Sequence, residues 1–432
     1  MKLCMIGAGY VGLVSGVCFS DIGNTVYCVD TNVSKINNLN KGIIPIYEPG
    51  LEELLKKNYN KKRLFFTTDI KKAIINSDIV FICVGTPTKK NGNSADLRFV
   101  FNAAKNICKY TNKYKIIVTK STVPLNTGDK IEKIFQNKKK SKYVDIVSNP
   151  EFLREGEAIR DFLYPDRIVV GTNTLKANKL LKSLYTPIIE KGCRYINTSR
   201  KGAELIKYAS NAFLATKITY INELANLCEK TGVNIKDISI GIGLDQRIGG
   251  RFLRAGPAYG GSCFPKDTRA LLDTSNKYNV NLSIIKSVVQ SNENRKKILT
   301  IKAQKLLKNK CKNKIITILG VTFKPNTDDM REASSLHMIK YFSKKKSIIK
   351  YYDPTGEKNE FIKLKNVKYC ETISKACFKS DLIIIHTEWN EFKLLNFKKL
   401  VKKRNFIVYD LRNIYSVDKM KKKGIKYFSV GR

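Results

Sequence analysis

One short stretch of the chain carries residue types that can perform nucleophilic chemistry. Residues 259–267 read Tyr-Gly-Gly-Ser-Cys-Phe-Pro-Lys-Asp, which sets Cys263 between a glycine pair and a lysine–aspartate pair. Two glycines allow the backbone to turn sharply and to approach a ligand closely. Ser262 is a typical helix N-cap, and Pro265 is tolerated in the first turn that follows. The pattern predicts that Cys263 lies at the start of a helix.

A thiol at a helix start is expected to be partly ionised, because the unpaired N–H groups and the helix dipole favour an anion. Lys266 adds a positive charge nearby. Asp267, about one turn further on, can orient a water molecule or accept a proton. The competing interpretation is a small buried thiol that only fills space. The glycine pair, the cap and the Lys266–Asp267 pair favour Cys263 as a nucleophile.

A second pair of polar residues lies on a long predicted helix. Residues 203–231 form an amphipathic run without proline that ends at Gly232. Lys207 and Asn211 are four positions apart in this run and therefore project from the same face of the helix. Since Lys207 lies among Leu, Ile, Tyr and Ala, its ammonium group is expected to be buried and to need a partner.

The N-terminal residues have the pattern of a dinucleotide-binding unit. Residues 2–6 are a predicted strand, residues 7–12 read Gly-Ala-Gly-Tyr-Val-Gly, and a helical pattern follows over 11–21. A second predicted strand, 25–29, ends at Asp30. Strand, glycine turn, helix, strand and acid in this order are the setting in which the glycine fingerprint binds a dinucleotide. The alternative is a glycine-rich turn without a ligand.

Each residue of this fingerprint has a physical role. Gly7 makes the tight turn, and Gly9 lets the pyrophosphate approach the helix N-terminus. Gly12 lets the helix and the strand pack closely. Asp30 is expected to bind the ribose hydroxyls and to repel a 2′-phosphate, which favours NAD over NADP.

Polar residues follow several further predicted strands, which span 78–84, 115–118 and 145–147. In a doubly wound sheet the ligand lies outside the carboxyl ends of the strands, so residues at these ends are candidates for binding. Any one of them alone could be a turn former or a cap, and only their shared placement argues for a role. They are Thr86, Ser121, Thr122, Glu151 and Glu155.

The length of 432 residues allows two or three domains. We expect an α/β protein with a Rossmann-type doubly wound sheet over 1–198 and an all-helical central region that carries the cysteine loop and the dimer contact over 199–308. A Rossmann-like α/β domain is expected over 309–432. This last domain lacks the glycine fingerprint, so it should bind something other than a second dinucleotide. Lys324 and Arg412 lie at its strand ends, where they could bind phosphate.

The charge of the chain is unusual, with 80 Lys and Arg against 37 Asp and Glu and a formal net charge of +43. Such a surface attracts polyanions, so nucleic acid is a conceivable partner. The lysines are scattered, however, and no nucleic-acid-binding motif occurs, so a solvated surface is favoured. A polyanion-binding protein on a dinucleotide-binding scaffold stays the alternative.

The eleven cysteines form no metal-type pairs, and only two histidines occur. We therefore expect no metal site and a reducing compartment, the cytoplasm. The sequence has no uninterrupted apolar run as long as a membrane span.

These parts together indicate a particular oxidation. With NAD, an alcohol gives an aldehyde, and a thiolate adds to the aldehyde to form a thiohemiacetal. A second NAD oxidises the thiohemiacetal to a thioester, which water hydrolyses to the acid. A simple alcohol dehydrogenase does not need the cysteine, so Cys263 favours the route through the thioester.

Four motifs together resemble the UDP-glucose 6-dehydrogenase family in order and spacing, and the resemblance covers essentially the whole chain. They lie at residues 7–13, 149–156, 204–213 and 260–267. The resemblance implies four-electron oxidation of UDP-glucose to UDP-glucuronate with two NAD. Sister enzymes that oxidise GDP-mannose or UDP-N-acetylhexosamines use the same machinery, so these substrates stay the alternative.

The resemblance also implies residue roles. Cys263 is the nucleophile, Lys207 and Asn211 stabilise the oxyanion, and Asp267 helps in proton transfer. Glu151 assists thioester hydrolysis through a water molecule near Thr122. The positions that match the family's cofactor residues are Gly7, Gly9, Val11, Gly12, Asp30, Lys35, Thr86, Thr122, Glu155, Lys266 and Arg331.

The same resemblance implies substrate-binding positions, and one of them indicates an oligomer. Arg247 matches an arginine that the family supplies from the neighbouring subunit, which implies at least a homodimer. Ala258 departs from the family pattern, since glycine is frequent there and a methyl group could crowd the sugar. The substrate positions are Glu151, Phe152, Leu153, Glu155, Lys207, Asn211, Arg247, Phe252, Leu253, Arg254, Ala255, Gly256, Gly260, Lys324 and Arg412.

Overall fold

The structure of the chain is a computed structural model that describes residues 1–89 and 94–432. It contains two compact units. Residues 1–210 and 269–280 form the N-terminal unit, and residues 211–268 and 281–432 form the C-terminal unit.

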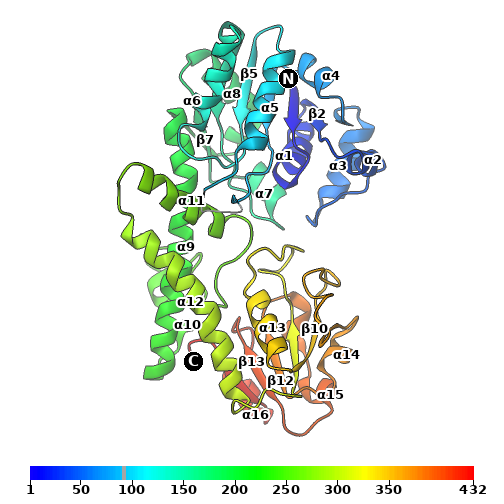
Figure 1. Cartoon of the computed structure of the whole chain (residues 1–432), viewed down its shortest axis with the longest axis vertical. Helices are drawn as coiled ribbons and strands as arrows, with labels where there is room; N and C mark the ends of the chain where they lie inside the picture. Colours follow the sequence, from blue (N-terminus) through cyan, green and yellow to red (C-terminus); the bar gives the residue numbers. More distant parts are fainter. Residues whose placement is uncertain (90–93) are drawn as a thin grey trace. The chain divides into compact units, whose positions relative to one another are not determined.

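An eight-stranded sheet forms the centre of the N-terminal unit, with the strand order β3-β2-β1-β4-β5-β6-β7-β8 (Figure 1). All pairs are parallel except β6 and β7, which meet antiparallel at Ser148 and Gly171. The order reverses between β1 and β4, the kind of switch point at which doubly wound sheets bind ligands. The strands are β1 (Lys2–Ile6), β2 (Thr25–Val29), β3 (Leu64–Thr67), β4 (Ile79–Ile82), β5 (Lys115–Thr119), β6 (Val144–Ser148), β7 (Arg167–Gly171) and β8 (Arg194–Thr198).

Both faces of the central strands are buried, which explains why β1, β4 and β5 are mostly apolar rather than alternating. Leu3 and Met5 of β1 belong to one hydrophobic cluster, and Cys4 and Ile6 belong to the cluster on the other face. The covering helices are α1 (Tyr10–Asp21), α2 (Val33–Asn40), α3 (Leu51–Asn60), α4 (Ile70–Ile75), α5 (Arg98–Tyr110), α6 (Thr127–Asn137), α7 (Ala158–Leu163) and α8 (Leu175–Ile189).

A six-stranded, all-parallel sheet forms the centre of the C-terminal unit, in the order β11-β10-β9-β12-β13-β14. The strands are β9 (Ile315–Leu319), β10 (Ile348–Tyr352), β11 (Val367–Tyr369), β12 (Leu382–Ile385), β13 (Ile407–Asp410) and β14 (Lys426–Ser429). Its helices are α13 (Ser334–Lys344), α14 (Ile373–Cys377), α15 (Phe397–Val401) and α16 (Val417–Lys422).

Between the two sheets in sequence lie four helices, so the prediction of two Rossmann-like α/β parts joined by a helical region is confirmed. They are α9 (Arg200–Thr231), α10 (Ile235–Gly243), α11 (Phe264–Lys277) and α12 (Ser283–Leu306). Helix α9 contributes residues to both units, because the boundary between the units falls after Ser210. The division into three domains at residues 198 and 308 stays a prediction.

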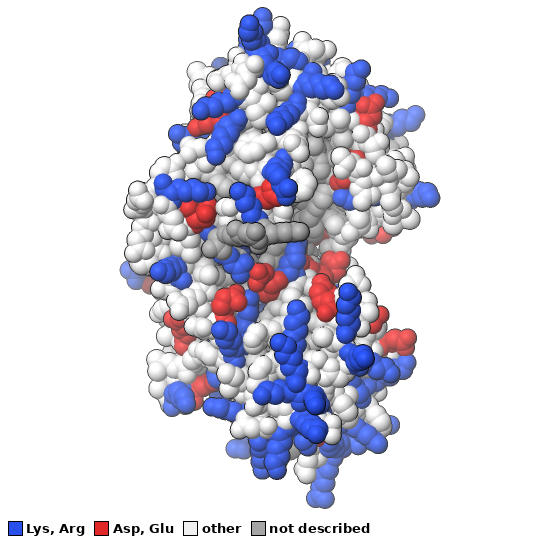
Figure 2. Space-filling model, in the orientation of Figure 1, with Lys and Arg blue, Asp and Glu red and all other residues white. Residues whose placement is uncertain are grey.

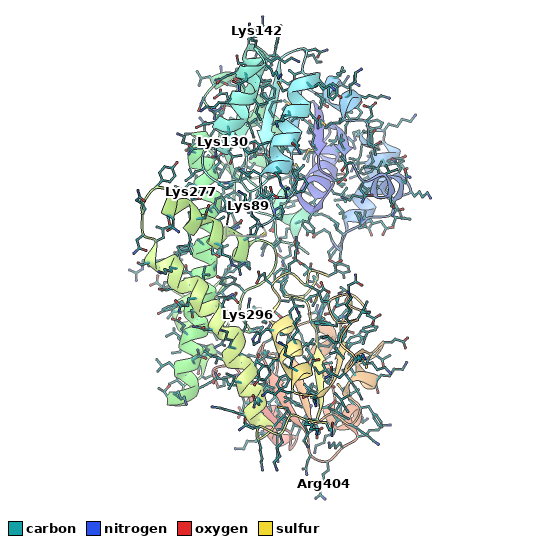
Figure 3. The ribbon with its side chains drawn as sticks, in the orientation of Figure 1. Lys89, Lys130, Lys142, Lys277, Lys296 and Arg404 are labelled. Atoms are coloured by element: carbon teal, nitrogen blue, oxygen red, sulfur yellow. The ribbon has the colours of Figure 1, made fainter. Side chains whose placement is uncertain are left out.

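The positive charge lies on the surface of both units. Figure 2 shows Lys and Arg side chains spread widely over the visible face. Lys130 and Lys142 of the N-terminal unit and Arg404 of the C-terminal unit are exposed (Figure 3). Among the described residues, none of the helices combines the length and the apolar character that a bilayer crossing requires. Within the same residues, no group of three or more His, Cys, Asp or Glu could hold a metal ion.

A buried histidine just after β12 is hydrogen-bonded through both of its ring nitrogens. His386 follows β12, and its Nδ1 lies 3.1 Å from the Thr387 hydroxyl, which itself donates to the Thr322 carbonyl. The ring must therefore donate from Nδ1, and its Nε2 accepts from the Ser334 hydroxyl at 2.7 Å. Burial lowers the pKa of His386 to about 3, with the charge of Arg412 acting in the same direction. The neutral ring is thus the form that the fold accommodates.

This environment predicts a loss of stability in acid. Because the unfolded chain binds a proton at His386 below about pH 6.5 while the folded chain does not, stability should fall as the pH drops from 6.5 towards 3. His386→Asn should remove this contribution, about 1.4 kcal/mol per pH unit. The measurement is denaturant unfolding of both proteins between pH 6.5 and 4.5. Equal slopes in the two proteins would contradict the prediction.

Candidate functional site

The glycine turn after β1 has the geometry that a dinucleotide needs. Gly7 has a φ of +100°, and a Cβ added there would lie 2.9 Å from the Cys83 carbonyl oxygen. A Cβ on Gly12 would lie 1.9 Å from the Gly7 oxygen, so helix α1 contacts the turn directly. Gly9, in contrast, faces open space, since an added Cβ would meet no atom within 4 Å. This space at the start of α1 fits a pyrophosphate.

Asp30 follows β2 and is held as an anion beside this turn. Its carboxylate accepts hydrogen bonds from the N–H groups of Ala8 and Asn32, both at 3.0 Å, and Lys35 Nζ lies 2.8 Å away. Partial burial opposes ionisation, but Lys35 and the two N–H groups outweigh it and hold the pKa of Asp30 below its usual range. An ionised acid here can accept hydrogen bonds from ribose hydroxyls.

The loops that follow β4 and β5 contact each other. The Thr86 hydroxyl donates to the Thr122 carbonyl at 2.9 Å. The Ser121 hydroxyl donates to the Val84 carbonyl at 2.7 Å. Thr86 and Ser121 are buried. The two loops therefore support each other at the carboxyl edge of the sheet.

Lys207 has the partner that its apolar setting required. Its Nζ lies 3.1 Å from Glu151 Oε1, and the two side chains are only 4% and 6% exposed. The second oxygen of Glu151 accepts from the Leu153 N–H at 2.6 Å. The Phe152 ring lies beside the same group, with Lys207 Nζ 5.2 Å from its centroid. Sequence analysis named these residues separately, and the structure brings them together in the N-terminal unit.

Three charged residues of the N-terminal unit have no role in the sequence analysis. Arg167 stacks on the Phe152 ring at 3.9 Å. Lys120 is buried, with its Nζ 3.2 Å from Asn149 Oδ1, and burial lowers its pKa to about 8. The third, Glu48, is buried in a loop and accepts from the N–H groups of Gly156 and Ala158 at 2.7 and 2.8 Å. It also pairs with the Tyr10 hydroxyl.

The cysteine loop lies in the C-terminal unit, and one detail of its prediction is wrong. Helix α11 begins at Phe264, and the Asp267 N–H donates to the Cys263 carbonyl at 2.8 Å. This is the first hydrogen bond of the helix, so the N-cap is Cys263 rather than Ser262. Gly261, with a φ of +77° and its N–H donating to the Arg331 carbonyl at 2.7 Å, turns the chain shortly before the helix starts. The Ser262 hydroxyl lies 3.5 Å from the thiol.

Cys263 differs from every other cysteine of the chain. It is partly exposed, whereas the remaining ten are buried. Asp267, one turn along α11, is completely buried and accepts from the Asn211 amide at 2.6 Å. Lys266 binds the second oxygen of the same carboxylate. The structure thus joins Asn211, Asp267 and Lys266, which sequence analysis had assigned separately.

Two of the predicted substrate positions in the C-terminal unit, Gly256 and Gly260, are glycines with close neighbours. A Cβ on Gly256 would lie 3.3 Å from Arg412 Nη1, and one on Gly260 would lie 2.8 Å from the Glu332 oxygen. Arg412 donates to the carbonyls of Phe323 and His386 at 2.8 and 2.9 Å, which places it beside the segment that contains Lys324. Of the loop 252–256 before this site, Leu253 and Ala255 are buried.

Two predicted arginines of this unit have exposed side chains that pair with acids close to them in sequence. The Arg247 side chain is 90% exposed and pairs with Asp245 in its own turn at 2.7 Å. Arg331 is also exposed and pairs with Asp329 at 2.8 Å. Their binding roles need a ligand or a second chain and stay predictions.

Three models of one protein family match successive parts of the chain. The NAD-binding domain of the UDP-glucose/GDP-mannose dehydrogenase family matches residues 1–189, its central domain matches 201–294, and its UDP-binding domain matches 317–417. The chain belongs to the UDP-glucose/GDP-mannose dehydrogenase family. The resemblance of the four sequence motifs is thereby confirmed, and NAD is the cofactor of this dehydrogenase.

Named relatives match the dehydrogenase over its full length. A UDP-glucose 6-dehydrogenase of Rhizobium meliloti is 46% identical and covers all of both chains. The UDP-glucose 6-dehydrogenase TuaD of Bacillus subtilis is 44% identical over all of this chain and 93% of its own. A solved UDP-glucose dehydrogenase from Pyrobaculum islandicum is 33% identical, with a TM-score of 0.91 over 99% of this chain and 97% of that one.

The glycine turn of the dehydrogenase yields a paired prediction. Gly12→Ala should lower the free energy of unfolding by about 1–3 kcal/mol, because its Cβ would overlap the Gly7 backbone. Gly9→Ala should leave the melting temperature unchanged but weaken NAD binding about tenfold, because a methyl group costing about 1.4 kcal/mol would occupy the phosphate space. Thermal unfolding and NAD titration of both variants check this. Unchanged NAD affinity in Gly9→Ala would place the cofactor elsewhere.

Proposed function

We propose that this dehydrogenase oxidises UDP-glucose to UDP-glucuronate and uses two NAD per sugar. The observation that carries the proposal is the setting of Cys263. It is the single partly exposed cysteine, it stands directly before α11, and Asp267 with its partner Asn211 lies one turn further on. The names of the full-length relatives support UDP-glucose as the substrate.

In the oxidation steps the chain's residues would move protons and hold oxygen atoms. NAD, when bound, accepts a hydride in each of two steps. Asp267 accepts the proton of the sugar alcohol as the aldehyde forms. The Cys263 thiolate then forms a C–S bond to the aldehyde carbon, and Lys207 and Asn211 donate hydrogen bonds to the resulting oxyanion. Loss of the second hydride leaves a thioester on Cys263.

Hydrolysis of the thioester is assigned to Glu151, the second acidic residue of the proposed site. The Glu151 carboxylate would orient a water molecule near Thr122 and accept its proton as the water attacks the thioester carbon. The C–S bond then breaks, and the Cys263 thiolate is regenerated. The ion pair with Lys207 and the N–H of Leu153 hold Glu151 in one orientation for this step.

The remaining predicted residues would bind the two ligands. The glycine turn, Asp30 and Thr86 bind NAD in the first of the proposed domains, 1–198. Lys324 and Arg412 bind the diphosphate in the third, 309–432. Phe252 to Gly256 and Gly260 line the nucleotide sugar. Arg331 and Lys266 complete the cofactor contacts.

The deciding measurement is the number of NADH formed per UDP-glucose, with native protein compared with Cys263→Ser. Two NADH are expected from the native protein, with loss of steady turnover in the variant because serine is a far weaker nucleophile. Cys311→Ser, which changes a buried cysteine of the same unit, is the matched control and should keep two NADH per sugar.

Other outcomes would change the proposal in defined ways. One NADH per sugar with an unaffected Cys263→Ser variant would indicate a simple alcohol dehydrogenase. Absence of turnover with UDP-glucose, but turnover with GDP-mannose or a UDP-N-acetylhexosamine, would keep the chemistry and change the substrate.

We further propose that the enzyme is at least a homodimer that shares its sites. Helix α9 exposes Phe213, Tyr220 and Leu227, which are 65%, 53% and 58% exposed. Their spacing of seven residues places them in one stripe along the helix, a pattern typical of helix–helix contacts between chains. Arg247, highly exposed in its own chain, would reach the substrate of the partner chain.

A mixing experiment tests this shared site. Arg247→Ala and Cys263→Ser should each be inactive alone, since each removes one part of every site. Dimers that contain one chain of each kind have one complete site, so random pairing should restore about a quarter of native activity. The double variant mixed with Arg247→Ala is the control and should stay inactive. Absence of recovery in mixed dimers would show that Arg247 serves its own chain.

The cellular location is proposed on the state of the thiols. In the part of the chain that the structure describes, none of the eleven cysteines forms a disulfide bond. Cysteines persist without disulfide bonds in a reducing compartment. We therefore propose that the enzyme acts in the cytoplasm.

A further inference from the structure

The backbone just before the cysteine loop is held by side chains that have no role so far. Asn292 of α12 accepts from the Tyr259 N–H at 2.9 Å and donates to the Tyr259 carbonyl at 3.1 Å. Both ends of one side-chain amide are thus used on a single backbone residue. Asn292 is 3% exposed, so water does not compete for these bonds.

Three residues earlier, a second group holds the same loop. The Gly256 N–H donates to Asn222 Oδ1 of α9 at 2.8 Å, and the Gly256 carbonyl accepts from Arg295 Nε of α12 at 3.1 Å. Arg295 Nη1 also donates to the Asn222 carbonyl at 3.0 Å and to Asn226 at 2.7 Å. Arg295 therefore ties the loop and both helices together.

The burial of Arg295 works against stability. Its hydrogen-bond acceptors are neutral carbonyl and amide oxygens, and burial lowers the pKa of its guanidinium. Among the described residues, its Nη2 has no hydrogen-bond partner. A buried cation whose hydrogen-bond acceptors are all neutral is unfavourable, and apolar residues would fill such a position at lower cost. The buried Arg295 is better explained by the hydrogen bond that it donates to the loop at Gly256 than by a contribution to the stability of the unit.

The loop between the two attachment points is strained. Ala258 has a φ of +104°, a conformation that residues with a side chain rarely adopt and that costs about 1–3 kcal/mol. This is the position at which the sequence departs from glycine. Because Gly256 and Tyr259 are both fixed, Ala258 cannot relax without breaking one of the attachments. Strain of this kind persists only where the surroundings impose it.

The attachments lead directly into the nucleophile. Gly260, Gly261 and Ser262 separate Tyr259 from Cys263, and the Gly261 N–H is itself bound to the Arg331 carbonyl at 2.7 Å. An added Cβ on Gly260 would overlap the Glu332 backbone at 2.8 Å, so this segment has little freedom once Tyr259 is fixed. A shift of the Tyr259 backbone would therefore be passed along this short, restrained segment to Cys263.

We infer that Asn222, Asn292 and Arg295 form a clamp that holds the backbone of residues 256–259 in its strained conformation and thereby positions Cys263 for attack. The inference rests on the proposed role of Cys263. The three are positioning residues, since they act on the loop and not on the substrate. The clamp also fixes Gly256, so it sets the nucleophile and the proposed sugar loop in one geometry.

Asn292 is the residue to test, because α12 does not depend on it for its own packing. Val288, Leu299 and Ala303 of α12 are buried in hydrophobic clusters of the same unit. The helix should therefore stay in place when the amide is removed. A substitution of Asn292 also leaves the neighbouring Arg295 and Lys296 unchanged (Figure 3 labels Lys296).

Asn292→Ala removes both bonds to Tyr259. We expect kcat with UDP-glucose to fall about 100-fold, the effect of a misplacement of about 1 Å at a reacting group. The KM for NAD should change much less than kcat, because the glycine turn, Asp30 and Thr86 lie in the other unit, and of the proposed cofactor residues only Lys266 and Arg331 adjoin the loop. Asn294→Ala, an exposed asparagine of the same helix, is the matched control and should behave as the native protein.

Asn292→Asp separates positioning from a general loss of structure. A protonated Asp side chain can accept from the Tyr259 N–H and donate to its carbonyl, as the amide does, whereas an ionised one repels the carbonyl. Activity of Asn292→Asp relative to native protein should therefore recover as the pH is lowered through the titration of the new carboxyl. Asn292→Ala should show no such recovery. If the alanine variant does not fold, the aspartate variant at low pH provides the same test.

Hydrogen exchange measures the clamp without any enzyme activity. Amides of residues 252–264 should exchange faster in Asn292→Ala and stay slow in Asn294→Ala. Slow exchange in Asn292→Ala would show that the clamp does not hold the loop, whatever the substrate is. Fast exchange in Asn292→Ala together with a native kcat would show that the clamp does not position Cys263. A reduced kcat in Asn292→Ala without recovery of Asn292→Asp at low pH would show the same.

If the native protein does not oxidise UDP-glucose, the proposed function fails while the exchange result still decides whether the loop is held. In that case the kcat comparison is made with whichever nucleotide sugar the protein oxidises. An unchanged kcat with that substrate in Asn292→Ala overturns the inference.

Discussion

A buried polar group needs a partner, and helix α9 satisfies this requirement twice within about one turn. Lys207 finds Glu151 at 3.1 Å in the N-terminal unit, and Asn211 finds Asp267 at 2.6 Å in the C-terminal unit. Each pair joins a helix residue to a loop or helix start more than fifty positions away. One helix thus carries a candidate catalytic residue in each unit. Lys207 pairs with Glu151, and Asn211 pairs with Asp267.

The first strand of each sheet, at the switch point, is followed by a glycine with a positive φ that is packed against the chain after the neighbouring strand. Gly7 follows β1 with a φ of +100°, and a Cβ there would strike the chain just after β4. Gly320 follows β9 with a φ of +73°, and a Cβ there would lie 2.6 Å from Thr387, just after β12. The second turn then continues with Thr322 and Pro325 instead of glycines. It therefore lacks the open phosphate space of Gly9, as expected for a part that binds another ligand.

The C-terminal unit accepts unfavourable local features where its loop approaches Cys263. Ala258 adopts a φ of +104°, and Arg295 is buried among neutral acceptors. Neither feature is what stability alone would select. Both lie on the path from the two helices to the nucleophile. The same pattern, in which strain is imposed by fixed neighbours, is frequent where a protein must hold a reactive group in one position.

The sequence by itself determined the features that are local in the chain: the glycine turn before α1, the acid after β2, the cysteine before α11 and the helix with Lys207 and Asn211. Their spacing reports backbone periodicity and turn geometry directly. Only the tertiary structure decided the partners. Glu48 lies 108 positions from Gly156, and Asn292 lies 33 from Tyr259. These residues bind backbone groups, which every residue type presents alike, so no side-chain pattern marks them before the chain is folded.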